Sequence, residues 1–283
     1  MAIETPSPEV TARLLPNFSP FRVTPPLGEA TSPDKSAPLL IFKGNKKLEK
    51  PEWEPSEEVC LDGVMFNIYH REGNMWVAIE RDGVEYIMFV SSDKSSYQSN
   101  LSLTKPGENF FLIALLRIAF LMAVAPYRTL KFHASVIEKE GKALIFLGES
   151  GTGKSTHSGL WLKYVPGSSL LNDDEPIVRI MDDGEVVVFG APWSGSTPCY
   201  RNVSAKVAAL VQLEQHSENI LTGPLGLEAY AQLFQLTALL QSDQTHRQYV
   251  ISTVLDVAEK VPLYRLRNRP DREAVALSAS ILY

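Results

Sequence analysis

A glycine-rich loop near the middle of this 283-residue chain constrains the fold more than any other feature of the sequence. A run of five apolar residues, Ala143–Leu147, leads directly into it, and a helix-forming stretch from about Lys154 to Tyr164 leaves it. The loop and the residue after it are Gly148, Glu149, Ser150, Gly151, Thr152, Gly153, Lys154, Ser155 and Thr156. A buried strand, a glycine-rich turn and a helix in this order predict a P-loop, a phosphate-binding unit.

The residue types in this loop suit phosphate chemistry. Glycine allows the backbone to bend so that successive N–H groups converge, and the start of the helix adds partial positive charge. In such loops the lysine, here Lys154, neutralises the outer phosphates of a nucleotide, and the hydroxyl, here Ser155, ligates Mg²⁺. We therefore expect residues 148–156 to bind a nucleotide, the alternative being a glycine-rich turn with a chance Lys-Ser pair.

A phosphate-bound metal ion needs an acidic partner, and the segment Ser169–Glu175 supplies one. A short apolar strand ends there at Asp173 and Asp174, and ligands bind at the carboxyl ends of strands in α/β sheets. Neighbouring side chains on a strand point to opposite sides, so one carboxylate can face the metal while the other is held apart. The alternative is an acidic turn that faces solvent.

One histidine precedes the loop at a suggestive distance. His133 lies 15 residues before Gly148, on a predicted strand over 132–138. It is a candidate metal ligand, or a group that tunes a neighbouring acid or base, because its charge changes near neutral pH. The alternative is a structural histidine.

Proline content and the pattern of predicted strands and helices divide the chain into three predicted parts. Ten of its 19 prolines fall before residue 56, which predicts an extended arm over 1–60 without a regular helix or a central strand. Residues 61–129 predict a small antiparallel meander followed by an apolar helix at 107–125. From 130 to 283 strands and helices alternate, with helices expected at 226–241 and 246–260, and this alternation predicts an α/β core.

Composition excludes several classes of protein. The net charge of −6 gives no broad basic surface for nucleic acid or anionic lipid. The apolar segment Phe110–Ala125 is shorter than the ~20 residues of a spanning helix and contains Arg117, so we expect a buried helix and no membrane span. The N-terminus lacks the pattern of a signal peptide, and Cys60 and Cys199 are too few for a disulfide scaffold. These features predict a cytoplasmic protein.

Three segments together resemble a known family: His133-Ala134-Ser135, the glycine-rich loop, and Leu171–Glu175. They resemble the C-terminal catalytic domain of HPr kinase/phosphorylase, which shares its nucleotide-binding fold with ATP-dependent phosphoenolpyruvate carboxykinase, a family with similar segments. The resemblance implies phosphoryl transfer from ATP with Mg²⁺, or Mn²⁺ in its place. It implies Asp173 as the base and Asp174 as the metal ligand, with the exchange of these roles left open. It also implies a cation near His133 and a homo-oligomer.

Arg201 follows a polar loop over 190–195 and is a candidate for neutralising the transferred phosphate, the alternative being a surface arginine. Three functions follow from these observations. The first is a kinase that phosphorylates a hydroxyl of a protein, peptide or small molecule. The second is carboxykinase chemistry on a small acid, although a carboxykinase is about twice as long. The third is a nucleotide-binding regulator without turnover.

Overall fold

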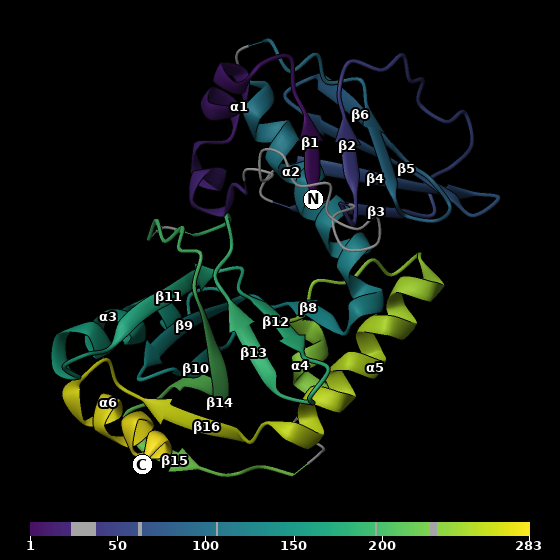
Figure 1. Cartoon of the computed structure of the whole chain (residues 1–283). Coiled ribbons are helices and arrows are strands. Elements are labelled where there is room, and N and C mark those ends of the chain that lie inside the picture. Colours follow the sequence, from purple (N-terminus) through teal and green to yellow (C-terminus); the bar gives the residue numbers. More distant parts are fainter. Residues whose placement is uncertain (24–37, 62–63, 106, 196, 227–230) are drawn as a thin grey trace. The chain divides into compact units, whose positions relative to one another are not determined.

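The computed structural model describes residues 1–23, 38–61, 64–105, 107–195, 197–226 and 231–283. It is a mixed α/β protein with two mixed sheets (Figure 1). The chain forms two compact units. The first comprises Met1–Val124 with Leu240–Gln244, and the second comprises Ala125–Leu239 with Thr245–Tyr283.

The first unit is built on a seven-stranded sheet in the order β1-β2-β7-β6-β5-β4-β3. Its strands are β1 (Ala2–Glu4), β2 (Ile41–Lys43), β3 (Glu57–Leu61), β4 (Val64–Arg71), β5 (Asn74–Arg81), β6 (Val84–Val90) and β7 (Ser96–Ser99). Strands β3 to β7 form the expected antiparallel meander, whereas β2 runs parallel to β7 and β1 parallel to β2.

The proline-rich segment belongs to this first unit, and the exclusion of a helix and a central strand from it is wrong. Helix α1 (Pro8–Leu14) begins on Pro8, where the missing N–H would have no partner in any case, and the Ser7 side chain caps it. A 3-10 helix, η1 (Pro16–Phe21), follows. Strand β2 contains no proline and can therefore lie between β1 and β7.

The apolar helix α2 (Glu108–Val124) packs on β5 and β6. The buried carboxylate of Glu108 accepts hydrogen bonds from the backbone N–H groups of Ser102, Thr104 and Lys105. With the 3-10 turn η2 (Ala125–Tyr127) the helix covers 20 residues and is, by length and composition alone, long enough to cross a membrane. More than half of its apolar stretch is buried within the protein.

The second unit holds a nine-stranded sheet, with the path β11-β9-β10-β14-β13-β12-β8 and with β16 and β15 extending it beside β14. Its strands are β8 (Thr129–Lys131), β9 (Ala134–Lys139), β10 (Lys142–Leu147), β11 (Ser169–Asp174), β12 (Ile177–Ile180), β13 (Val186–Phe189), β14 (Ser204–Gln215), β15 (Ile220–Thr222) and β16 (Leu263–Asn268). Its helices are α3 (Lys154–Tyr164), α4 (Ala231–Gln235), α5 (Gln244–Lys260), α6 (Arg272–Ala279) and the 3-10 turn η4 (Ser280–Leu282).

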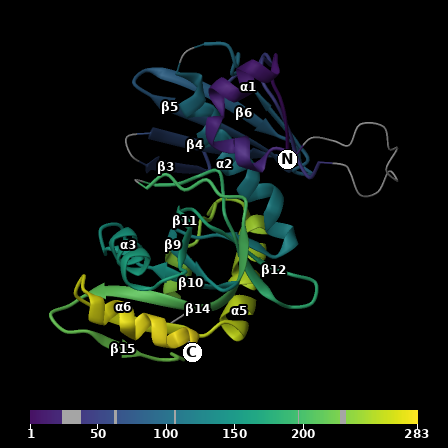
Figure 2. The ribbon, with the colours of Figure 1, turned by 60° about the vertical axis from the view of Figure 1, so that its left-hand side comes forward.

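Helices cover both faces of this second sheet (Figures 1 and 2). The side chains of β10 alternate between the two faces, which explains why its sequence is apolar from Ala143 to Leu147. Ala143, Ile145 and Leu147 join the core under α5, while Leu144 and Phe146 join the core under α3 and α6. The expected α/β class is therefore confirmed.

One predicted helix is largely absent from the described residues. Of the expected helix 226–241, residues 227–230 lie outside the described residues, α4 covers Ala231–Gln235, and the chain is not helical from 236 on. The backbone there pairs with the strand region instead, because His133 N–H donates to the Leu236 carbonyl and Ala238 N–H donates to the Lys131 carbonyl. Tertiary pairing thus overrides local helix propensity.

Candidate functional site

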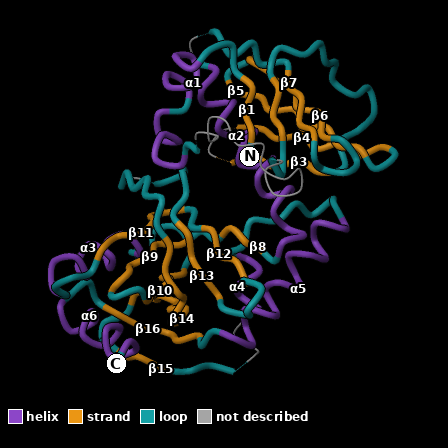
Figure 3. Tube along the Cα trace, viewed as in Figure 1, coloured by secondary structure: helices purple, strands orange, loops and turns teal. Residues whose placement is uncertain are grey.

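The register of three neighbouring strands brings the predicted site segments together (Figure 3). Leu147 at the end of β10 pairs with Ala134 at the start of β9, and Ala134 pairs with Asp174 at the end of β11. Since β9 runs antiparallel to both neighbours, β10 and β11 end at the same edge of the sheet. The glycine-rich loop after Leu147, the acidic pair and His133 therefore meet at this edge.

The loop joins β10 to α3 through glycines that no other residue type could replace without strain. Gly148, Gly151 and Gly153 have φ angles of 152°, 83° and 98°. A Cβ added to Gly148 would lie 2.6 Å from the Thr152 hydroxyl. That hydroxyl donates to the Glu149 carbonyl over 2.8 Å, while the Glu149 and Ser150 side chains are exposed.

Lys154 is buried at the start of α3, and its ammonium group is held by the loop itself. It donates to the carbonyl oxygens of Gly148 and Glu149 over 2.8 and 3.0 Å. Burial lowers the pKa of Lys154, and the nearby carboxylates of Asp174 and Asp173 partly oppose this shift. The loop therefore holds the Lys154 ammonium group close to the carboxylates of Asp173 and Asp174.

Ser155 and Asp173 are in direct contact. The Ser155 hydroxyl donates to Asp173 Oδ1 over 3.0 Å. Asp173 is 3% exposed, and its second oxygen, Oδ2, is buried without a hydrogen-bond partner among the described residues. Ser155 and Thr156 are exposed on the first turn of α3. A buried carboxylate oxygen without a partner beside a hydroxyl is a favourable place for a cation.

The donors at this place suit Mg²⁺ better than a metal that needs many protein ligands. No group of three or more His, Cys, Asp or Glu side chains that could hold a metal occurs in the described ranges. Mg²⁺ commonly takes one or two protein oxygens and completes its shell with waters and substrate phosphates. Ser155 and Asp173 would supply two such oxygens.

Asp174 contacts His133 and has an unusual backbone conformation. His133 Nδ1 lies 2.9 Å from Asp174 Oδ1, and both side chains are partly exposed. The φ angle of Asp174 is 120°, a region that non-glycine residues rarely adopt. Asp173 and Asp174 therefore have different neighbours, as expected for adjacent positions on a strand.

Sequence reasoning missed two polar residues beside this pair. Asn172 is fully buried; its amide donates to the Trp193 carbonyl, and its oxygen accepts from Glu175 N–H, both over 3.0 Å. Lys131 Nζ lies 2.8 Å from Glu175 Oε1. Asn172 lies within the segment 171–175 that carries the resemblance but has no predicted role there, and Lys131 belongs to no ligand pattern, so only the fold shows what the two side chains contact.

Arg201 lies at the other end of β11 from the acidic pair. Its guanidinium group donates to the Leu170 carbonyl and, over 3.1 Å, to the Ser169 hydroxyl. These contacts tie the segment after β13 to the start of β11. The fold does not bring Arg201 together with Lys154 and Asp173, and its assigned role toward phosphate stays a prediction.

A cavity of about 420 Å³ adjoins the glycine-rich loop. The loop and α3 line one side of it, and the ends of β14 and β16 line the other. The lining residues are Gly151, Thr152, Gly153, Thr156, His157, Gln215, His216, Asn268, Arg269 and Pro270. Gln215 pairs with Asn268 across the strands, and its side chain donates to the Gly151 carbonyl over 3.0 Å. This hydrogen bond joins the two sides of the cavity, because Gln215 lines one side and Gly151 lines the other.

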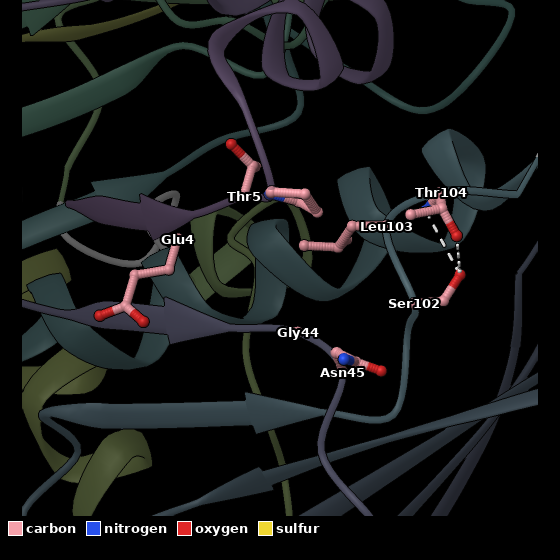
Figure 4. A pocket seen from close by; sticks show the side chains of 8 residues that line it. Glu4, Thr5, Gly44, Asn45, Ser102, Leu103 and Thr104 are labelled. Atoms are coloured by element: carbon pink, nitrogen blue, oxygen red, sulfur yellow. Dashed lines mark hydrogen bonds between the residues drawn. The ribbon is translucent and has the colours of Figure 1, made fainter.

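A second cavity, of about 370 Å³, belongs to the N-terminal unit (Figure 4). Its lining comes from the ends of β1 and β2 and from the turn before α2, including Thr5, Asn45 and Leu103. Within it the Ser102 hydroxyl contacts the Thr104 hydroxyl over 2.9 Å and also bonds the Glu108 carboxylate. These two hydroxyls thus bond each other, and we assign this cavity no ligand.

No protein-family model matches the chain, and no curated protein matches its sequence significantly. The mixed α/β class rests on the fold, and the resemblance to a known family stays a prediction from the three segments around residues 133, 148–156 and 171–175.

Proposed function

We propose that this protein is an ATP-dependent phosphotransferase of the HPr kinase-like type, with a P-loop core, that phosphorylates a hydroxyl group. The observation that carries the proposal is the convergence of Lys154, Ser155 and Asp173 at one sheet edge, with the Asp174–His133 pair beside them. In this proposal the loop N–H groups and Lys154 bind the outer phosphates. Ser155 and Asp173 hold Mg²⁺, which neutralises charge on these phosphates when bound.

The contacts favour one of the two role assignments that the sequence leaves open. Asp173 contacts the Ser155 hydroxyl, which suits a shared metal ion, whereas Asp174 contacts His133. We therefore assign metal binding to Asp173 and proton acceptance to Asp174. The acceptor hydroxyl gives its proton to the Asp174 carboxylate as its oxygen bonds the γ-phosphorus, and the bond to the leaving oxygen of ADP breaks.

The cavity beside the loop provides a place for the nucleoside. Its volume, about 420 Å³, lies in the range of small-molecule sites. Asn268 lines this cavity, and an amide side chain can hydrogen-bond the edge of a nucleobase.

The deciding experiment measures binding and transfer separately. Calorimetry with ATP and Mg²⁺ measures binding to wild type, Asp173→Asn and Asp174→Asn, and radiolabelled ATP follows transfer to candidate hydroxyl acceptors. We expect Asp174→Asn to retain binding and to lose about 10²–10⁴-fold in transfer, the usual effect of removing a base. Asp173→Asn should weaken the dependence of ATP binding on Mg²⁺. Undiminished transfer by Asp174→Asn would refute its role as base, and binding without transfer in wild type would favour a regulator.

A further inference from the structure

Asn172 connects the segments on both sides of the acidic pair. Its side chain is completely buried. It accepts from the backbone N–H of Glu175, the residue after the pair, and it donates to the carbonyl of Trp193 in the loop that follows β13, each over 3.0 Å. One side chain thus fixes the chain after Asp174 and the loop beside it.

The same loop contacts the backbone of the pair directly. Gly195 N–H and the Ser194 hydroxyl both donate to the Asp173 carbonyl, over 2.7 and 3.0 Å. Asp174 forms an isolated antiparallel bridge with Ser194. A Cβ added to Gly195 would lie 3.2 Å from the Cβ of Asp174, so a side chain there would require Asp174 to shift by a few tenths of an ångström.

These contacts surround the one residue of the site with a strained backbone. The φ angle of 120° at Asp174 is rare for a residue with a side chain, and such conformations persist only where the surroundings hold them. The bond from Asn172 to Glu175 N–H fixes the peptide that follows Asp174. Without it, the backbone at Asp174 can relax to an ordinary conformation, which turns the carboxylate away from its present direction.

We propose that Asn172 is a positioning residue that holds Asp173 and Asp174 in the two directions needed for metal binding and proton acceptance. The inference rests on the proposed function. Asn172 contacts neither nucleotide nor acceptor, and it acts through the backbone on either side of Asp173 and Asp174. Residues that orient metal ligands in this way typically contribute about 10–100-fold to metal affinity or activity.

The test separates the metal-dependent part of nucleotide binding from the part that the loop supplies. ATP affinity is measured with a metal chelator and again with saturating Mg²⁺, for wild type, Asn172→Ala and Gly195→Ala. We expect the ATP affinity without metal to stay within about twofold of wild type for both variants. The factor by which Mg²⁺ increases the ATP affinity should fall about tenfold or more. Gly195→Ala perturbs the same backbone without touching Asn172, and it decides the matter if Asn172→Ala does not fold.

Thr253→Ala is the matched control. Thr253 is also buried in the second unit, and its hydroxyl donates to the Tyr249 carbonyl within α5, so its loss likewise removes a hydrogen bond from a buried side chain to the backbone. If Mg²⁺ increases the ATP affinity of Asn172→Ala and Gly195→Ala as much as that of wild type, this inference is wrong while the proposed function stands. The same holds if Thr253→Ala loses as much of the Mg²⁺-dependent affinity as the two variants do. The absence of any gain in wild type would overturn the proposed function and this inference together.

Discussion

The hydroxyl of Ser155 and the carboxylate of Asp173 form a hydrogen bond of 3.0 Å, although 18 residues separate them in the chain. Ser155 stands on the first turn of α3, and Asp173 stands near the end of β11, two strands away from β10. This contact joins the glycine-rich loop to the acidic segment. It is the reason for assigning metal binding to Asp173 in the proposed function.

Lys154→Ala should weaken ATP binding about tenfold or more. Hydrogen bonds between charged groups contribute about 1.5–3 kcal/mol, and the substitution removes the buried ammonium at the mouth of the loop. Calorimetry with ATP and Mg²⁺ measures the change. Lys163→Ala, in the last turn of the same helix, is the control and should bind as wild type. Equal affinities for wild type and Lys154→Ala would exclude phosphate binding by this lysine.

Asn268→Ala should weaken binding of ATP about tenfold, as expected for one lost hydrogen bond, and leave binding of inorganic tripolyphosphate unchanged. The reason is that Asn268 lines the cavity beside the loop and does not belong to the loop itself. The two ligands are compared by competition against a fluorescent nucleotide. An equal loss for both ligands would contradict a nucleoside role for this cavity.

His157 should make the protein less stable in acid. Burial lowers the pKa of His157 to about 4, and its Nε2 lies 3.0 Å from the Ser278 hydroxyl. In the unfolded chain the pKa of this histidine is about 6.5. Between about pH 6.5 and 4 the unfolded state therefore binds a proton that the native state does not bind. The free energy of unfolding consequently falls as the pH drops from about 6.5 toward 4.

Urea unfolding at about pH 7 and about pH 5 tests this dependence in wild type and His157→Gln. The wild type should lose about 2 kcal/mol more than the variant over this interval. The comparison cancels the contributions of the other histidines, which both proteins share. Parallel losses in the two proteins would show that His157 does not titrate in this way.

Arg201→Ala should lower the free energy of unfolding by about 1–3 kcal/mol, because its charged hydrogen bonds to the Leu170 carbonyl and the Ser169 hydroxyl are lost. If Arg201 acts only through these contacts, the affinity for ATP with Mg²⁺ stays within about threefold of wild type. A lost hydrogen bond between Arg201 and phosphate would lower that affinity by more than this. Thermal unfolding and calorimetry on the same preparation give both quantities. A large loss of transfer in a variant with native stability would instead support the predicted contact with phosphate.

The local parts of the candidate site could be read from the sequence because their chemistry is local. The glycines of the loop, Lys154 and Ser155 fall within one short segment, and the apolar run before it and the helix after it lie where the pattern predicts them. The end of α4 could not be read in this way. Residues after Gln235 leave the helix because their backbone pairs with His133 and Lys131.

The sequence by itself determined the α/β class and the residue types that gather at the loop, since alternation of apolar residues and the special backbone of glycine are properties of short segments. Only the tertiary structure decided which carboxylate meets Ser155, that Arg201 lies at the far end of β11, and that Asn172 and Gly195 enclose Asp174. These relations depend on strand register and on a loop that returns to β11 after about 20 residues, and no local pattern encodes such a return.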